Sequence, residues 1–183
     1  MSTEIAWHDA GGHADTALAA HVASVLGEGD VRTGRLCPRC GSADHGQPWA
    51  RLDGRSVSVS LSRSGPHLVT AVGGEGRIGI DVEEVAEVAA RWQAALVLAP
   101  GEEAPTSEDQ ARTWARKEAI LKAYAVGLDE PMTGFAVSDF DGELHDLPAP
   151  EGFVAALAVV SSRRGAPAGP AGRSGTTTSR TGP

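Results

Sequence analysis

Residues 114–123 read WARKEAILKA and predict a helix that carries charge on its apolar face. Both lysines of the chain, Lys117 and Lys122, lie in this stretch, whereas every other basic side chain except histidine is arginine. At 3.6 residues per turn, Trp114, Glu118 and Lys122 share the face that we expect to be buried. An exposed Glu–Lys pair four residues apart, worth about 0.2–0.5 kcal/mol, is the alternative interpretation. Charged groups that face an interior need partners or mark a functional site.

The predicted helix begins at Ser107 and ends near Tyr124. Ser107 with Gln110 three residues later forms a capping box, and Gly127 lies near the expected end. We expect the opposite face to meet solvent; it carries Arg112, Arg116 and Ala123.

A second charged motif, RIGIDVE at residues 77–83, alternates as a strand does. Asp81 and Glu83 are two residues apart, so both carboxylates project from one face and repel each other unless a cation lies between them. A strand that simply runs out into solvent before a helix is the alternative. With Glu118 and the adjacent lysines, the acids form a set that suits Mg²⁺ and a phosphorylated compound. Lysine, a compact point charge, suits a single phosphate oxygen in a tight cleft.

The remaining pattern predicts an α+β fold with two similar α/β lobes. Expected helices are 14–26 and 84–98, expected strands are 56–62, 67–73, 134–140 and 152–160, with 56–73 as a hairpin, and 29–53 is expected to be irregular. We assign residues 1–83 to an N-terminal lobe, 84–160 to a C-terminal lobe and 161–183 to a disordered tail rich in Gly, Pro, Ser and Thr.

Composition excludes several classes of function. The formal net charge of -8 argues against nucleic acid as the main partner, because phosphate backbones require a basic surface. No apolar run approaches the roughly 20 residues of a membrane span, and no signal peptide is evident. The only cysteines, Cys37 and Cys40, are too few and too close for a secreted disulfide scaffold, so we expect a cytoplasmic protein.

A cysteine-rich segment, CPRCGSADHGQP at residues 37–48, allows a second kind of site. Cys37, Cys40 and His45 are zinc ligands by type and spacing. A structural zinc needs four ligands, and His13 or His21 would have to supply the fourth.

Several motifs, taken in their order along the chain, resemble those of the Sfp-type 4′-phosphopantetheinyl transferase family. GIDVE at 79–83 and WARKEAILK at 114–122 resemble its G-[IV]-D-x-E and W-x-x-K-E-[AS]-x-x-K elements. CPRCGSADHGQP resembles CPxCG…HGKP, and SVSLSRSGPHLVTAV resembles the family's SHSG hairpin. AVGLDEPMTGFAV resembles its glycine-leucine loop, so the similarity covers roughly residues 37–160.

The resemblance implies two halves related by a pseudo-two-fold axis, with coenzyme A and Mg²⁺ at their interface, and we expect a monomer. It implies transfer of the 4′-phosphopantetheine arm of coenzyme A to a serine of an apo acyl carrier or peptidyl carrier protein, with release of 3′,5′-ADP. Carried over by position, the Mg²⁺ ligands are Asp81, Glu83 and Glu118. Glu118 is also the catalytic base, Lys122 neutralises the pyrophosphate, and Lys117 supports it.

Residues expected to bind coenzyme A include two departures from the family pattern. Arg63 replaces the histidine of SHSG, and Gln47 replaces the lysine of GKP. The expected set is Ser62, Arg63, Ser64, Gly46, Gln47, Pro48 and Lys122. These departures leave open a catalytically impaired family member that binds coenzyme A or a carrier protein without turnover. A generic Mg-dependent phosphohydrolase is a third interpretation.

Overall fold

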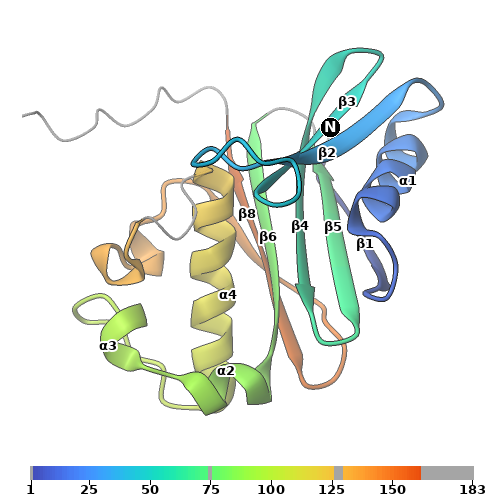
Figure 1. Cartoon of the computed structure of the whole chain (residues 1–183). Coiled ribbons are helices and arrows are strands. Elements are labelled where there is room, and N and C mark those ends of the chain that lie inside the picture. Colours follow the sequence, from blue (N-terminus) through green and yellow to red (C-terminus); the bar gives the residue numbers. More distant parts are fainter. Residues whose placement is uncertain (1, 74–75, 126–129, 162–183) are drawn as a thin grey trace, which may run out of the picture.

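The computed structural model describes residues 2–73, 76–125 and 130–161, and these form two β-sheets with helices packed against them (Figure 1). The five-stranded sheet has the order β1-β5-β4-β3-β2, with β1 Glu4–Asp9, β2 Val31–Leu36, β3 Gln47–Leu52, β4 Arg55–Ser64 and β5 His67–Gly73. The three-stranded sheet has the order β6-β8-β7, with β6 Arg77–Glu84, β7 Glu143–Leu147 and β8 Phe153–Val160. The helices are α1 Ala14–Leu26, α2 Val85–Arg91, α3 Ala94–Val97 and α4 Ser107–Tyr124, with 3-10 turns η2 Met132–Gly134 and η3 Val137–Asp139.

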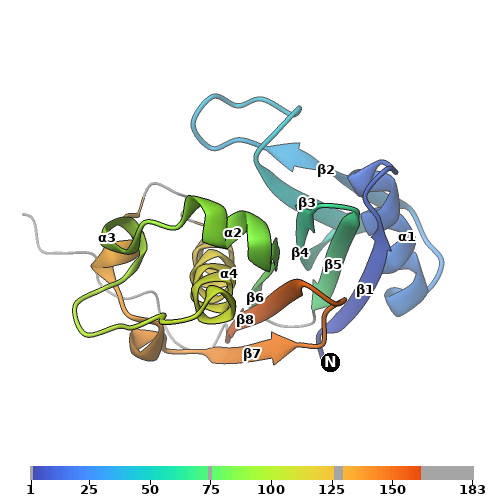
Figure 2. The same cartoon turned by 90° about the horizontal axis from the view of Figure 1, so that it is seen from below.

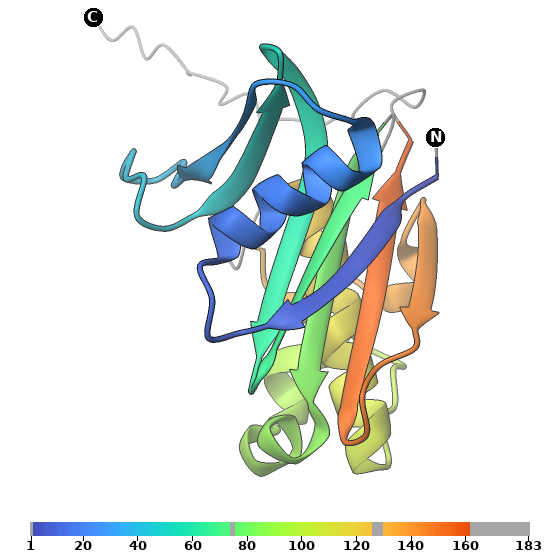
Figure 3. The same cartoon turned by 90° about the vertical axis from the view of Figure 1, so that its right-hand side faces the viewer.

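The two long helices cover different sheets. Helix α1 buries Leu18 and Val22 against Ala50, Val59 and Val72 of the five-stranded sheet. Helix α4 packs on β6 and β8 of the three-stranded sheet, and Figure 2 shows it end-on against these strands. Figure 3 shows α1 in front of the strands and α4 behind them. The α+β class predicted from the sequence is confirmed, while the pseudo-two-fold relation between two lobes stays a prediction.

The two sheets meet at β4 and β6 through serine side chains. The backbone N–H of Ile80 donates to Ser60 Oγ at 3.0 Å, and the N–H of Glu84 donates to Ser64 Oγ at 3.0 Å. Alternate residues of a strand point to the same side, so the Ser-x-Ser pattern of β4 presents a row of hydroxyls to β6. This row aligns the strand that carries Asp81 with the N-terminal sheet.

Close contact between α4 and β6 depends on Gly79. A Cβ built at Gly79 would lie 1.9 Å from the carbonyl oxygen of Ala119 and 2.5 Å from the backbone nitrogen of Ala123. Only glycine allows the helix backbone to approach the strand this closely. The contact places Glu118 and Lys122 over the strand that carries Asp81.

The helices and strands predicted from the sequence are confirmed where the hydrophobic periodicity is strong. The prediction is wrong where residues typical of turns lie inside strands. Helix 14–26, the β4–β5 hairpin, β6, α4 and β8 are confirmed. The expected solvent face of α4 is wrong at Ala123, which is only 1% exposed because the helix is covered from several sides. The capping box of α4 is formed by Thr106 and Asp109, one residue earlier than predicted. Ala125, in the left-handed conformation, ends the helix, and Gly127 lies outside the described residues.

Several segments of the structure differ from the prediction. β1 was not expected, and residues 29–53 contain strands β2 and β3 rather than an irregular chain. Residues 84–98 form two helices, because the extended backbone of Trp92 and Gln93 turns the chain so that Val97 packs with Leu121 and Met132.

The expected strand at 134–140 is wrong: this segment forms 3-10 turns, in which Asp139 accepts a hydrogen bond from the N–H of Ala136. The strand that pairs with the other edge of β8, opposite β6, is β7, which follows Gly142. The lobe boundaries stay a prediction, and the predicted tail at 161–183 lies outside the described residues except for Ser161. Among the described helices, none is long and apolar enough to cross a membrane.

Substitution Gly79→Ala should destabilise the fold by about 3 kcal/mol or more, because the added methyl group meets helix backbone that cannot move alone. The free energy of unfolding in urea measures this loss. Gly134→Ala is the control, since its Cβ would meet no atom closer than 3.8 Å. Equal stability of the two variants would contradict the close approach of α4 and β6.

Candidate active site

The centre of the candidate site is Asp81, which is only 2% exposed at the middle of β6. Its Oδ1 accepts hydrogen bonds from Ser62 Oγ at 2.7 Å and from Lys122 Nζ at 2.5 Å. Its Oδ2 is buried and has no hydrogen-bond partner among the described residues. A buried carboxylate oxygen without a partner is costly unless a ligand or cation satisfies it.

Lys122 joins strand and helix at this point. Besides the ion pair with Asp81, its Nζ donates to the carbonyl oxygen of Ile80 at 3.1 Å. Its side chain is 29% exposed, whereas that of Asp81 is 3% exposed. The ammonium group is therefore held on the strand while it still borders open space.

Two further carboxyls lie close enough to feel the charge of Asp81. Burial raises the pKa of Glu83 to about 8, with Asp81 and Glu118 adding to the shift, while Lys122 and the Trp114 Nε1–H group oppose it. That indole group donates to Glu83 Oε1 at 3.1 Å. Burial, followed by the charge of Asp81, also raises the pKa of Glu118, and Lys122 opposes this. Three acids and one lysine thus form one electrostatic cluster.

The donor set of this cluster suits a hard divalent cation. Mg²⁺ prefers oxygen ligands and keeps several waters or phosphate oxygens of its own. Oδ2 of Asp81, which has no hydrogen-bond partner among the described residues, offers a lone pair, and a cation would relieve the repulsion that adds to burial in raising the pKa of Glu83 and Glu118. Asp81, Glu83 and Glu118 therefore fit a magnesium ion. Their ligand atoms do not all lie within 4.8 Å of one another, a spacing that the described residues reach at Cys37, Cys40 and His45.

A cavity of about 520 Å³ opens beside Glu118 and Lys122, between α4 and the loop that joins β2 to β3. The opposite wall comes from that loop and its ends and from β4, and it comprises Arg35, Cys37, Pro38, Arg39, His45, Gly46, Gln47, Pro48, Val59, Ser60 and Leu61. One cavity is thus lined by residues 46–48, which were predicted to bind coenzyme A, and by Glu118 and Lys122 of the acidic cluster. The two groups lie some seventy positions apart in the chain.

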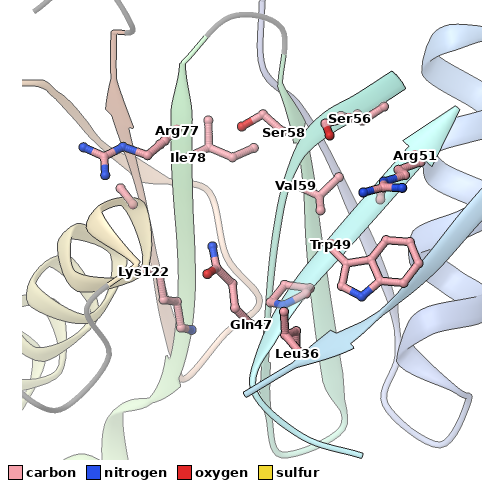
Figure 4. Close-up of a pocket in the computed structure, with 14 residues that line it drawn as sticks. Leu36, Gln47, Trp49, Arg51, Ser56, Ser58, Val59, Arg77, Ile78 and Lys122 are labelled. Carbon is pink, nitrogen blue, oxygen red and sulfur yellow. The ribbon is translucent and has the colours of Figure 1, made fainter. Parts of the chain in front are cut away.

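A second cavity of about 530 Å³ adjoins the first. Gln47, Pro48 and Lys122 line both cavities. Figure 4 shows its side chains, among which Trp49, Arg51 and Arg77 add an indole and two cations. The two spaces thus share residues, and cationic side chains line both of them.

Three of the predicted ligand-binding residues do not line these cavities. Ser62 donates to Asp81 and Ser64 accepts from Glu84, so both hold the junction between the sheets. Arg63 lies between them in β4 and points to the other side, where its Nη2 donates to the carbonyl oxygen of Gly12 at 3.1 Å. A contact between Arg63 and a phosphate in the cavity therefore has no support in this arrangement.

Lys117 also lies apart from the cluster. Its side chain is fully buried, and its Nζ donates to the carbonyl oxygens of Val97, Met132 and Phe135 at 2.7–2.8 Å. It also forms an ion pair with Glu102 at 2.5 Å. Lys117 holds the chain segments before and after α4 against this helix. It can therefore affect Lys122 only indirectly, by stabilising the position of α4.

Sequence reasoning missed several residues that border the site. Arg35 and Arg39 belong to a segment expected to be irregular, and Arg77 was taken only as the start of a strand. Trp114 was placed on the face of Glu118 but its hydrogen bond to Glu83 was not anticipated. The helix face that Trp114 shares with Glu118 could have indicated that Trp114 borders the site. The sequence gives no such indication for the three arginines, because arginine is common throughout the chain.

Comparison with known proteins finds a family match over part of the chain. The model of the 4′-phosphopantetheinyl transferase superfamily matches residues 77–156. This range contains Asp81, Glu83, Glu118 and Lys122, but not the five-stranded sheet that forms the other wall of the cavities. No curated protein sequence matches the chain significantly.

Replacing Lys122 by methionine should cost about 1–3 kcal/mol of stability in the presence of a chelator, because it leaves the buried charge of Asp81 without its cation. The loss should shrink when Asp81→Asn is added, since no charge then remains to be compensated. Urea unfolding of the two single variants and the double variant measures this coupling. Simply additive losses would show that the ion pair does not stabilise the fold.

Lys117→Met should cost about 3–5 kcal/mol, because three carbonyl oxygens and Glu102 lose their buried cation. Thermal and urea unfolding measure the loss. The control is Arg116→Met on the same helix, whose ion pair with Asp146 lies at the surface and should be worth less than about 1 kcal/mol. A similar small loss for both variants would contradict the structural role of Lys117.

Proposed function

We propose that this protein is an Mg-dependent 4′-phosphopantetheinyl transferase of the Sfp type. It transfers the phosphopantetheine arm of coenzyme A to a serine of an apo acyl carrier or peptidyl carrier protein and releases 3′,5′-ADP. The superfamily match at residues 77–156 supports a transferase of this general kind. Magnesium, the carrier protein, a monomeric state and the Sfp subtype are parts of the proposal.

The observation that carries the proposal is the position of the acidic cluster beside the cavity. Glu118 and Lys122 line the cavity, and Lys122 holds Asp81, whose Oδ2 lacks a partner among the described residues. A diphosphate in this cavity would meet the ammonium group of Lys122, and the neighbouring acids would hold the metal ion that offsets its remaining charge. Coenzyme A, with its diphosphate between a nucleotide and an extended arm, suits a site of two adjoining cavities.

The chemistry assigned to the residues is positioning and charge stabilisation. The serine hydroxyl of the carrier protein attacks the β-phosphorus of coenzyme A, and the bond from that phosphorus to the bridging oxygen breaks. The bridging oxygen leaves as part of 3′,5′-ADP, and the serine proton passes to Glu118. Glu118 is assigned this role because it lines the cavity beside Lys122.

Lys122 neutralises charge on the diphosphate as the bond breaks, because its ammonium group borders the cavity. Asp81, Glu83 and Glu118 would hold the Mg²⁺ ion, which would supply further positive charge at the phosphate oxygens. Asp81 has a second task in this scheme: through Oδ1 it keeps Lys122 in place against the strand. Ser62 restrains the same oxygen from the neighbouring sheet.

A second candidate function is binding of coenzyme A or a carrier protein without turnover. The observation that favours it is the position of Arg63, which donates to Gly12 instead of facing the cavity. Gln47 lines both cavities without adding a positive charge. Both features reduce the number of positive side chains that can contact a nucleotide. They therefore weigh against a high affinity for coenzyme A more than against a metal site at the acidic cluster.

The test is incubation of the protein with Mg²⁺, coenzyme A and several apo carrier proteins, followed by mass measurement of each carrier. A gain of one phosphopantetheine supports the transferase. Binding of coenzyme A without any mass gain would favour the binding protein. Release of inorganic phosphate with no acceptor present would favour a phosphohydrolase.

Glu118→Gln should lower the transfer rate by about 100-fold or more at saturating Mg²⁺, because it removes both a proton acceptor and a metal ligand. Glu108→Gln on the same helix is the control, since Glu108 lies at the surface in an ion pair with Arg112. The rate of carrier modification by mass spectrometry measures both variants. Activity near that of the unmodified protein for Glu118→Gln would remove Glu118 from both assigned roles.

A further inference from the structure

The loop between β2 and β3 brings three metal-ligating side chains together at a place separate from the acidic cluster. Ligand atoms of Cys37, Cys40 and His45 all lie within 4.8 Å of one another. Cys37 is half-buried, while Cys40 and His45 are exposed. Within the described parts of the chain, no fourth side chain joins this group, and His13 and His21 lie on or beside α1.

The spacing of the ligand atoms suits a tetrahedral ion. Cys40 Sγ and His45 Nε2 are 3.4 Å apart. Zinc bonds of about 2.3 Å to sulfur and about 2.0 Å to nitrogen require a separation of about 3.5 Å at a tetrahedral angle. An ion between these two atoms therefore needs almost no movement of the loop.

The backbone of the loop is shaped to hold both sulfurs on one side. The N–H of Gly41 donates to the carbonyl oxygen of Cys37 at 2.8 Å, and the N–H of Cys37 donates to the carbonyl oxygen of Ser42 at 2.9 Å. Gly41 takes a φ of 70°, which glycine adopts without strain.

A second glycine brings the histidine to the cysteines. Gly46 has a φ of 103°, and a Cβ there would lie 2.5 Å from the backbone nitrogen of Cys37 and 2.5 Å from the carbonyl oxygen of Leu36. The chain after His45 thus presses on the chain before Cys37. Any side chain at position 46 would push the imidazole away from the two sulfurs.

We propose that Cys37, Cys40 and His45 bind a zinc ion whose fourth position is filled by solvent or by an external ligand. The acidic cluster prefers a hard cation, whereas two thiolates and an imidazole select a softer one, so the two sites take different metals. Cys37, His45, Gly46 and Gln47 also line the 520 Å³ cavity. The zinc ion therefore fixes one wall of that cavity, and this inference stands whether or not the protein is a transferase.

Cobalt substitution tests the site in the full-length protein, purified under reducing conditions and freed of any histidine tag. Co²⁺ is added in the presence of excess Mg²⁺, which occupies the acidic cluster. The expected result is one equivalent of bound Co²⁺ with strong visible bands of a tetrahedral ion and an ultraviolet thiolate-to-metal band. Zn²⁺ should abolish the spectrum by competition, and it should also raise the melting temperature.

Cys40→Ser and His45→Ala should each weaken Co²⁺ and Zn²⁺ binding by at least about 100-fold, since even outer partners of metal ligands are worth 10–100-fold. Asp44→Asn is the matched control, because it changes a charge in the same loop without touching the three ligands. Circular dichroism checks that each variant is folded. The zinc-dependent rise in melting temperature should vanish in the first two variants and persist in the control.

Three outcomes would overturn the proposal. One is a reduced protein that binds no Co²⁺, or binds it without a thiolate band. Another is unchanged affinity in folded Cys40→Ser. The last is a Cys37–Cys40 disulfide in the peptide map of freshly purified protein that remains the stable form when zinc is supplied, which would make the pair a redox couple.

Discussion

The contact between the backbones of α4 and β6 at Gly79 is the constraint on which the site depends. A methyl group at this position would lie 1.9 Å from a helix carbonyl oxygen, so the spacing between helix and strand is set by the absence of a side chain. Lys122 reaches both Ile80 O and Asp81 Oδ1 only because its own Cβ lies so close to the strand. A wider spacing would separate the lysine from the acid and would leave Asp81 buried without any cation.

Burial of Asp81 sets the electrostatics of everything near it. A single lysine and a serine hydroxyl compensate one of its oxygens, while the other has no partner in the described structure. Its negative charge then disfavours ionisation of Glu83 and Glu118, whose pKa values are raised first by their own burial. Such a cluster is unfavourable for folding alone, and its arrangement makes sense when a further positive charge is part of the working state.

Sequence patterns predicted the elements whose residues repeat with a clear period, and failed where the deciding contacts are distant. The periodicity of α4 and the alternation of β6 were sufficient to predict one acidic cluster with Lys122. Strands β2 and β3 were hidden because Gly34 and Pro48 resemble turn residues, whereas in the fold Trp49 covers Gly34 across the strand pair. The buried position of Lys117 was not predictable, since its partners are backbone carbonyls that carry no signal in the sequence.

The five-stranded N-terminal sheet limits what the family match at residues 77–156 says about function, because the sheet lies outside the matched range. That range holds the acidic cluster, but residues between 35 and 61 supply the opposite wall of both cavities. Under the proposed function, the cluster would hold a cation beside the diphosphate, whereas the wall would contact the groups attached to the diphosphate. Gln47 adds no positive charge to this wall, whereas Arg35, which pairs with Asp15, and Arg51 belong to it, and Arg77 of β6 lines one cavity from the matched range. Under the proposed function, these arginines would take over the phosphate contact that a lysine at position 47 would provide, because a guanidinium group binds two phosphate oxygens at once.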